Sequence, residues 1–123
     1  MAIVPDMAME TLNVPSGNNL PPTISVNAHA GSTATATIIG NNWYGKITIA
    51  SAGTGQAAGV QASVTFGAAF QRTPFVILMP ADATSQGINA EAANPSTTGF
   101  DVDSATAPTA ASNYIYYFLV LQS

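Results

Sequence analysis

The feature that most constrains the fold is the strict alternation of apolar and polar residues in VQASVTF, residues 60–66. In an extended strand, successive side chains point to opposite faces, so the four apolar residues of this segment share one face and the three polar residues share the other. GKITIA (45–50) and GFDVD (99–103) alternate in the same way. Segments of this kind predict half-buried strands of an antiparallel sheet, with one face on a core and one face outward.

Four further segments complete the predicted set of strands: 32–39, 75–79, 88–92 and 113–123. Gly, Asn and Pro separate them, no helix of ordinary length is apparent, and no internal repeat occurs. FVILM (75–79) has no polar alternation, which predicts a strand covered on both faces. These patterns together predict an all-β protein with a single antiparallel β-sandwich, jelly-roll-like, over residues 31–123, preceded by an extended N-terminal arm over residues 1–30.

The closing segment, NYIYYFLVLQS, is apolar on both faces when it is drawn as a strand. One face is expected to fill the sandwich core, and the other is then left for a partner subunit or for the arm. Its aromatic residues are therefore candidates for either an oligomer interface or the core: Tyr114, Tyr116, Tyr117 and Phe118.

Composition favours a protein that associates. The 123 residues fit one domain, and although 47% are hydrophobic, many of these are alanines, which bury little surface. There is no cysteine for a disulfide, and charged residues make up 7% of the chain against about 25% in an average soluble domain. A thin core under a weakly charged surface predicts stability gained from copies of the same chain or from a larger scaffold.

Charge and hydropathy exclude two classes of partner. Lys46 and Arg72 are the only basic residues and the net charge is −4, whereas binding to phosphates needs several cations along one groove. No stretch approaches the roughly 20 apolar residues of a membrane span, and the first residues lack the basic start and apolar run of a signal peptide. We therefore expect no nucleic-acid partner and no membrane partner.

Residues 1–30 have the character of an extended arm. Four prolines interrupt any regular element there, yet large apolar residues recur along the segment. Those expected to anchor the arm, either on its own domain or on a capsid or neighbouring subunit, are Ile3, Val4, Met7, Met9, Leu12 and Val14.

Few residues suggest chemistry. His29 is the only histidine and has no partner for a metal site or a triad, so it is expected on the surface. Asp101 and Asp103 fall on one side of a predicted strand, where they suit a solvated face better than a Ca²⁺ site completed by Asp82. We expect no catalytic residue, no cofactor and no metal.

Trp43 and Tyr44 follow a predicted turn at Asn41 and Asn42. Exposed aromatic residues of this kind are able to stack on a sugar ring, which makes both candidates for contact with a ligand. The alternative is that Trp43 is buried as a plug at one end of the sandwich.

Several spaced segments, in order, resemble a module of phage tail fibres, tailspikes and other virion surface proteins: GKITIASAGTG, VTFGAAFQRTPFVILMPA, TTGFDV and the aromatic closing strand. The matching positions cover about three quarters of the chain and are Gly45, Ile47, Ile49, Gly53, Gly55, Val64, Thr65, Phe66, Phe70, Pro74, Val76, Pro80, Ala81, Gly99, Phe100, Val102, Ala107, Pro108 and Tyr116. The resemblance implies a β-sandwich that assembles as a trimer on the virion surface, and it implies no enzymatic activity.

In fibres this module follows a long shaft, whereas here only a short arm precedes it. We therefore expect a homotrimeric capsid cement or decoration protein, made in the host cytoplasm, which stabilises the phage head by binding the major capsid protein or other virion proteins through the arm. The alternative is a receptor-binding tip or short tail fibre protein, whose partner would be a host surface glycan.

Overall fold

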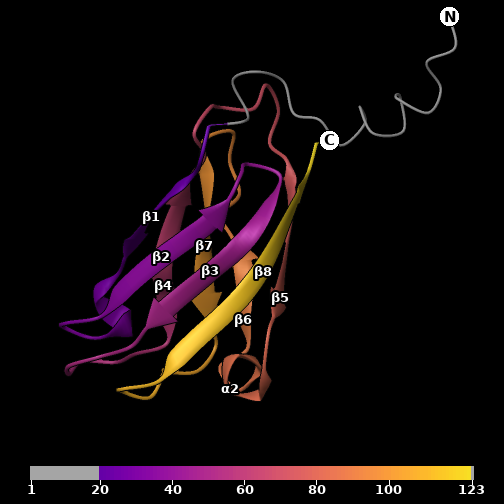
Figure 1. Ribbon diagram of the computed structural model, residues 1–123. Helices are drawn as coiled ribbons and strands as arrows, with labels where there is room; N and C mark the ends of the chain where they lie inside the picture. Colours follow the sequence, from indigo (N-terminus) through magenta and orange to yellow (C-terminus); the bar gives the residue numbers. More distant parts are fainter. Residues whose placement is uncertain (1–19, 123) are drawn as a thin grey trace, which may run out of the picture.

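The computed structural model describes residues 20–122, which form two antiparallel four-stranded sheets packed face to face (Figure 1). One sheet has the order β1 (Thr23–Val26), β4 (Gly59–Thr65), β7 (Gly99–Ser104) and β6 (Ala90–Ala93). The other has the order β2 (Thr35–Gly40), β3 (Tyr44–Ala50), β8 (Asn113–Leu121) and β5 (Phe75–Pro80). The predicted all-β sandwich is confirmed.

Most connections cross from one sheet to the other. Only β2–β3 and β6–β7 are hairpins between neighbouring strands of one sheet. A 3-10 turn, η2 (Ala28–Ala30), lies between β1 and β2, and a short helix, α2 (Ala83–Gln86), lies between β5 and β6. The last strand, β8, runs between β3 and β5 in the middle of its sheet (Figure 1).

The core is the space between the sheets, where the inward residues of every strand except the edges are almost fully buried. Phe66 is central among them, because its ring packs edge-to-face on Phe70 and lies 5.9 Å from the ring of Phe100, which in turn lies 5.9 Å from that of Phe118. Large aliphatic residues complete the layer: Ile47, Ile49, Val64, Ile88, Val102 and Val120. The core is thus chiefly aromatic and branched, although alanine is abundant in the sequence.

Ser85 connects α2 to the central strand β8 through two hydrogen bonds. Its hydroxyl oxygen accepts a hydrogen bond from the backbone N–H of Ile115 (2.6 Å), and its carbonyl oxygen accepts one from the hydroxyl of Tyr116 (2.8 Å). Burial raises the pKa of the Tyr116 hydroxyl above its ordinary value. At the start of the helix, hydrogen bonds from the side chain and backbone of Ser85 lower the pKa of Asp82. The buried serine therefore links the end of the helix to the core.

Three expectations differ from the structure. The strict alternation expected in 60–66 is interrupted by a β-bulge between Val60 and Ala62, so Val60 pairs with Asp103 on the outer side of the sheet and Gln61 is buried. Thr23–Val26, which the sequence placed in the arm, pairs with β4 as an edge strand, so the sandwich starts before Gly31. FVILM was expected to be covered on both faces, and this was wrong: Phe75, Ile77 and Met79 are exposed in the chain. The reason is that β5 is an edge strand of a two-layer sandwich, whose outer face has no third layer above it.

Candidate interaction surface

The outer surface of the β2–β3–β8–β5 sheet is covered by large apolar side chains. Because strand residues alternate between faces, every second residue of β5 and β8 points away from the core. We call this surface the apolar face, and its large apolar residues, each between 42 and 65% exposed, are Ile39, Tyr44, Phe75, Ile77, Met79, Tyr117, Leu119 and Leu121.

The strand register makes these side chains one continuous patch. On β8, Tyr117 is paired with Met79 of β5, and Leu119 is paired with Ile77. Toward the other side, Leu119 is paired with Tyr44 of β3. Directly opposed side chains on one face lie close enough to touch, so the patch runs across three adjacent strands without interruption. Contiguous apolar patches of this kind mark surfaces of protein–protein contact.

The outer surface of the opposite sheet has the reverse character. We call it the polar face. Its outward residues are mostly polar, with Val60 and Ala93 among them, and the polar ones are Thr23, Ser25, Ser63, Thr65, Glu91, Asp101 and Asp103. Asp101 is held within it, because its carboxylate accepts hydrogen bonds from the Ser63 hydroxyl (2.7 Å) and the Asn94 side-chain amide (2.9 Å). This arrangement fits the expected solvated face.

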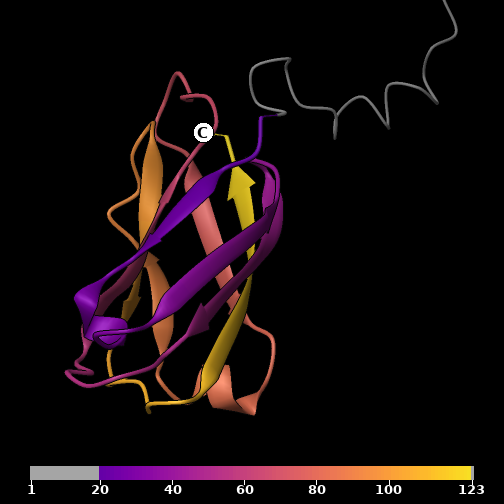
Figure 2. The same ribbon diagram turned by 60° about the vertical axis from the view of Figure 1, so that its left-hand side comes forward.

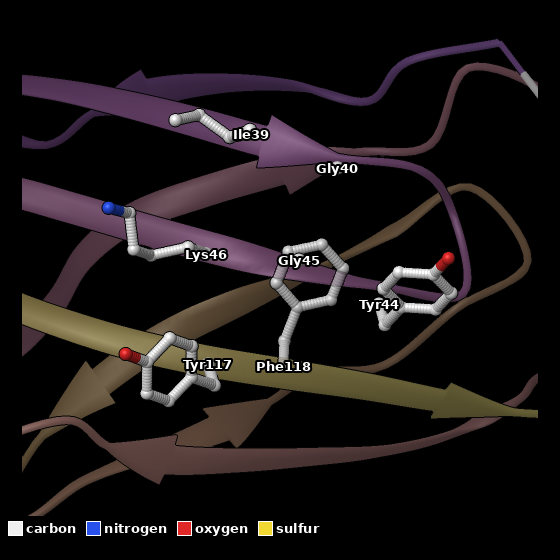
Figure 3. A pocket seen from close by; sticks show the side chains of 7 residues that line it. All are labelled: Ile39, Gly40, Tyr44, Gly45, Lys46, Tyr117 and Phe118. Atoms are coloured by element: carbon white, nitrogen blue, oxygen red, sulfur yellow. The ribbon is translucent and has the colours of Figure 1, made fainter.

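A depression of about 440 Å³ opens at one side of the apolar face, between β2, β3 and β8 (Figure 3). Tyr44 and Tyr117 stand beside it, and the ring of Phe118 lies at Gly45 in its floor. A Cβ atom on Gly45 would come within 2.8 Å of that ring and 2.1 Å of the carbonyl oxygen of Ile39. Glycine at this position therefore leaves room for the ring of Phe118.

Lys46 is the only charged residue in the four strands of this sheet. It lies on the apolar face next to the depression, opposite Ile39 on β2 and Tyr117 on β8. A lone cation among apolar side chains favours a partner that is apolar with a negative charge at the matching position.

The structure separates the residues predicted as ligand contacts. Tyr44 lies on the apolar face, whereas Trp43 is half-buried and packs edge-to-face on Phe70 with ring centroids 5.3 Å apart. Consecutive residues at the start of a strand point in opposite directions, so the two aromatic rings do not form one sugar platform. Trp43 is thus partly buried against the core.

The aromatic residues of the closing strand also divide between two environments. Tyr114, Tyr116 and Phe118 are buried in the core, and Tyr117 alone is exposed on the apolar face. The hydroxyl of Tyr114 accepts a hydrogen bond from the backbone N–H of Thr109 at 2.7 Å, which gives it a structural role.

The remaining candidate residues give less support for a functional site. His29 is exposed, as expected. Within residues 20–122 no group of three or more His, Cys, Asp or Glu side chains is placed to hold a metal ion, and no helix there is long and apolar enough to cross a membrane. The arm residues Ile3, Val4, Met7, Met9, Leu12 and Val14 lie outside the described residues.

Sequence reasoning missed most of the apolar face. It grouped Tyr117, Leu119 and Leu121 on one face of the closing strand without deciding which face is outward, and it assigned no outward role to Ile39, Phe75, Ile77 or Met79. The doubly apolar pattern of the closing strand was the signal that pointed to this surface, and the position of β5 beside that strand is what extends it.

Comparisons with known proteins give no relative. No family model matches the chain, and neither the curated proteins nor the solved structures contain a significant match.

Proposed function

We propose that this chain is a non-enzymatic structural protein of a bacteriophage particle, and that it acts as a homotrimeric capsid cement or decoration protein. In this function, copies hold one another and the underlying capsid proteins, and the particle gains resistance to internal pressure. The observation that carries the proposal is the apolar face, a continuous surface of eight large exposed apolar residues on a domain of this size.

Association would stabilise the chain considerably. Covering a side chain such as Phe75 or Leu121 removes apolar surface from water. This burial stabilises the assembly by about 25 cal/mol for each Å² covered. The opposite, polar face needs no cover, because its hydroxyls and carboxylates are solvated or bonded to one another. A subunit on the surface of a particle needs one face that its neighbours cover and another that is exposed to water. The outer faces of the two sheets suit these two environments.

The resemblance to virion surface modules adds the biological setting. Many of the residues that carry it are core residues here, among them Ile47, Val64, Phe66, Val102 and Tyr116. They therefore support a shared architecture, and the assignment to the virion is a proposal built on that architecture.

Copy number in purified phage particles tests the proposal. Quantitative gel electrophoresis with mass spectrometry should find the chain in hundreds of copies per particle, in a fixed ratio to the major capsid protein, because a decoration protein follows the symmetry of the lattice. Absence from purified particles would refute the function.

The depression beside Tyr44 and Tyr117 favours a second candidate, a receptor-binding tip or short tail fibre protein that binds a host surface glycan. Exposed tyrosine rings are able to stack on a sugar ring, with the amine of Lys46 as a polar contact. A count of tens of copies or fewer per particle, together with glycan binding that Tyr44→Ala abolishes, would select this function.

A further inference from the structure

We infer that residues 1–19 of a neighbouring copy cover the apolar face, with their apolar side chains on the face and their acidic residues toward Lys46. This inference rests on the proposed function, because exchange of arms requires that copies of the chain assemble. The inferred partner of the apolar face is therefore the N-terminal segment of a second copy of the chain.

The first argument is chemical complementarity. Residues 1–19 carry apolar residues in close succession, and the charged ones among them are Asp6 and Glu10, with no lysine or arginine. The apolar face carries one charge, Lys46. An apolar segment with only acidic side chains matches an apolar surface whose only charge is a cation.

The second argument is position. Leu20, where the described chain begins, lies against Gly67, and the N–H of Gly67 donates a hydrogen bond to Asn42 in the β2–β3 turn (2.8 Å). Figure 2 shows this start of the chain at the same end of the sandwich as the β2–β3 turn and the tip of β8. The point to which residues 1–19 are attached therefore lies at the end of the sandwich that carries Tyr44 of the apolar face.

The third argument is reach. At about 3.3 Å per residue, 19 extended residues span at most about 60 Å, whereas the nine residues of β8 span about 30 Å. The segment is long enough to pass beyond its own domain and to lie along the face of an adjacent one.

The depression offers an anchoring point for such a segment. Its lining is apolar, apart from Lys46 at the border, and it is bounded by Tyr44 and Tyr117 (Figure 3). Met7 and Met9 are two residues apart, so in an extended segment they point to the same side. Methionine is unbranched and adapts to irregular cavities, which suits it to this site.

A charge reversal with a matched control tests the electrostatic part. Lys46→Glu in the full chain should weaken self-association by about fivefold, the upper range for one exposed charge pair, as measured by analytical ultracentrifugation. Arg72→Glu makes the same change in net charge at an exposed residue outside the face and should leave association unchanged. Asp6→Lys combined with Glu10→Lys should restore association to the Lys46→Glu chain. Equal weakening by both reversals, or no rescue, would overturn the inference.

Because the chain has no cysteine, disulfide trapping tests the placement directly. A Met9→Cys chain mixed with a Tyr117→Cys chain should form a mixed disulfide pair under mild oxidation, since such a bond requires Cα atoms within about 7 Å. Thr65→Cys, on the polar face, should form none. A link only within a single chain that carries both Met9→Cys and Tyr117→Cys would place the segment on its own domain, and no link at all would remove it from the face. Either result overturns the inference.

The two proposals fail in different ways. Trapping uses purified protein, so a chain absent from phage particles that still forms the mixed pair would refute the virion function and leave the exchange of arms. A chain that is abundant in particles but forms no mixed pair would refute the exchange of arms and leave the virion function. Circular dichroism of each variant establishes that its sandwich is folded.

Discussion

The two sheets of this sandwich share one core but present opposite surfaces. The β1–β4–β7–β6 sheet faces outward with serine, threonine and carboxylates, and the β2–β3–β8–β5 sheet faces outward with large aliphatic and aromatic side chains. Folding of a single chain accounts for the inner faces, because both sheets contribute buried side chains to the core. The difference between the outer faces is therefore the observation on which the proposed association rests.

The largest effect is expected inside the core, where the two faces of one strand can be compared. Phe118 is 3% exposed and Leu119, the next residue of β8, is 42% exposed. Phe118→Ala should lower the free energy of unfolding by about 3–5 kcal/mol because it leaves a cavity beside Phe100. Leu119→Ala should cost less than about 1 kcal/mol in the isolated chain.

Urea denaturation at low protein concentration measures both variants without the contribution of association. Similar costs for the two substitutions would mean that the outer face of β8 is already buried in the smallest folded unit.

An intermediate effect is expected when one charge is placed on each outer face. Leu119→Asp puts a carboxylate in the centre of the apolar face and should weaken self-association by roughly 2 kcal/mol or more. Thr65→Asp adds the same group to the polar face and should leave association unchanged. Light scattering over a range of concentrations checks both, and loss of association by the Thr65 variant alone would show that the polar face is the interface.

The smallest effect is expected at α2, the short helix between β5 and β6. Hydrogen bonds from Ser85 lower the pKa of Asp82 below 3.8, so the carboxylate stabilises the folded state above that pH and loses this contribution as the pH falls through its folded pKa. Asp82→Ala should therefore lower the Tm slightly and by a constant amount above about pH 5, and the difference should shrink toward pH 2. Thermal scans across this range measure it, and a difference independent of pH would contradict the assignment.

The alternation of residues in the sequence predicted most strands to within a few positions. β4 was expected at 60–66 and lies at Gly59–Thr65, and β7 was expected at 99–103 and lies at Gly99–Ser104. β1 was missed because Pro21 and Pro22 precede it. Proline is compatible with the entry to an edge strand, where one side makes no ladder hydrogen bonds, so these residues do not exclude a strand that starts at Thr23.

The candidate surface was predictable only in part. The closing strand is apolar on both faces, and this pattern predicted an uncovered apolar face and made Tyr117 a candidate interface residue. The sequence did not reveal that β5 is an edge strand next to β8. Through this neighbour relation, FVILM, which was expected to be buried, contributes three of the eight residues of the apolar face. Strand order depends on pairings between distant segments, which local patterns do not encode.

The central position of β8 also determines when the molecule can fold. β3 and β5 each pair with β8 and not with one another, and β8 is the last of the described strands to be synthesised. Until Leu121 has left the ribosome, the facing edges of β3 and β5 have no partner, and the inner layer lacks Tyr114, Tyr116, Phe118 and Val120. The nascent chain can therefore pair β2 with β3 but cannot join β5 to them before β8 is available. Closure of the sandwich is a late step that adds the aromatic residues of β8 to the core and completes the apolar face at the same moment.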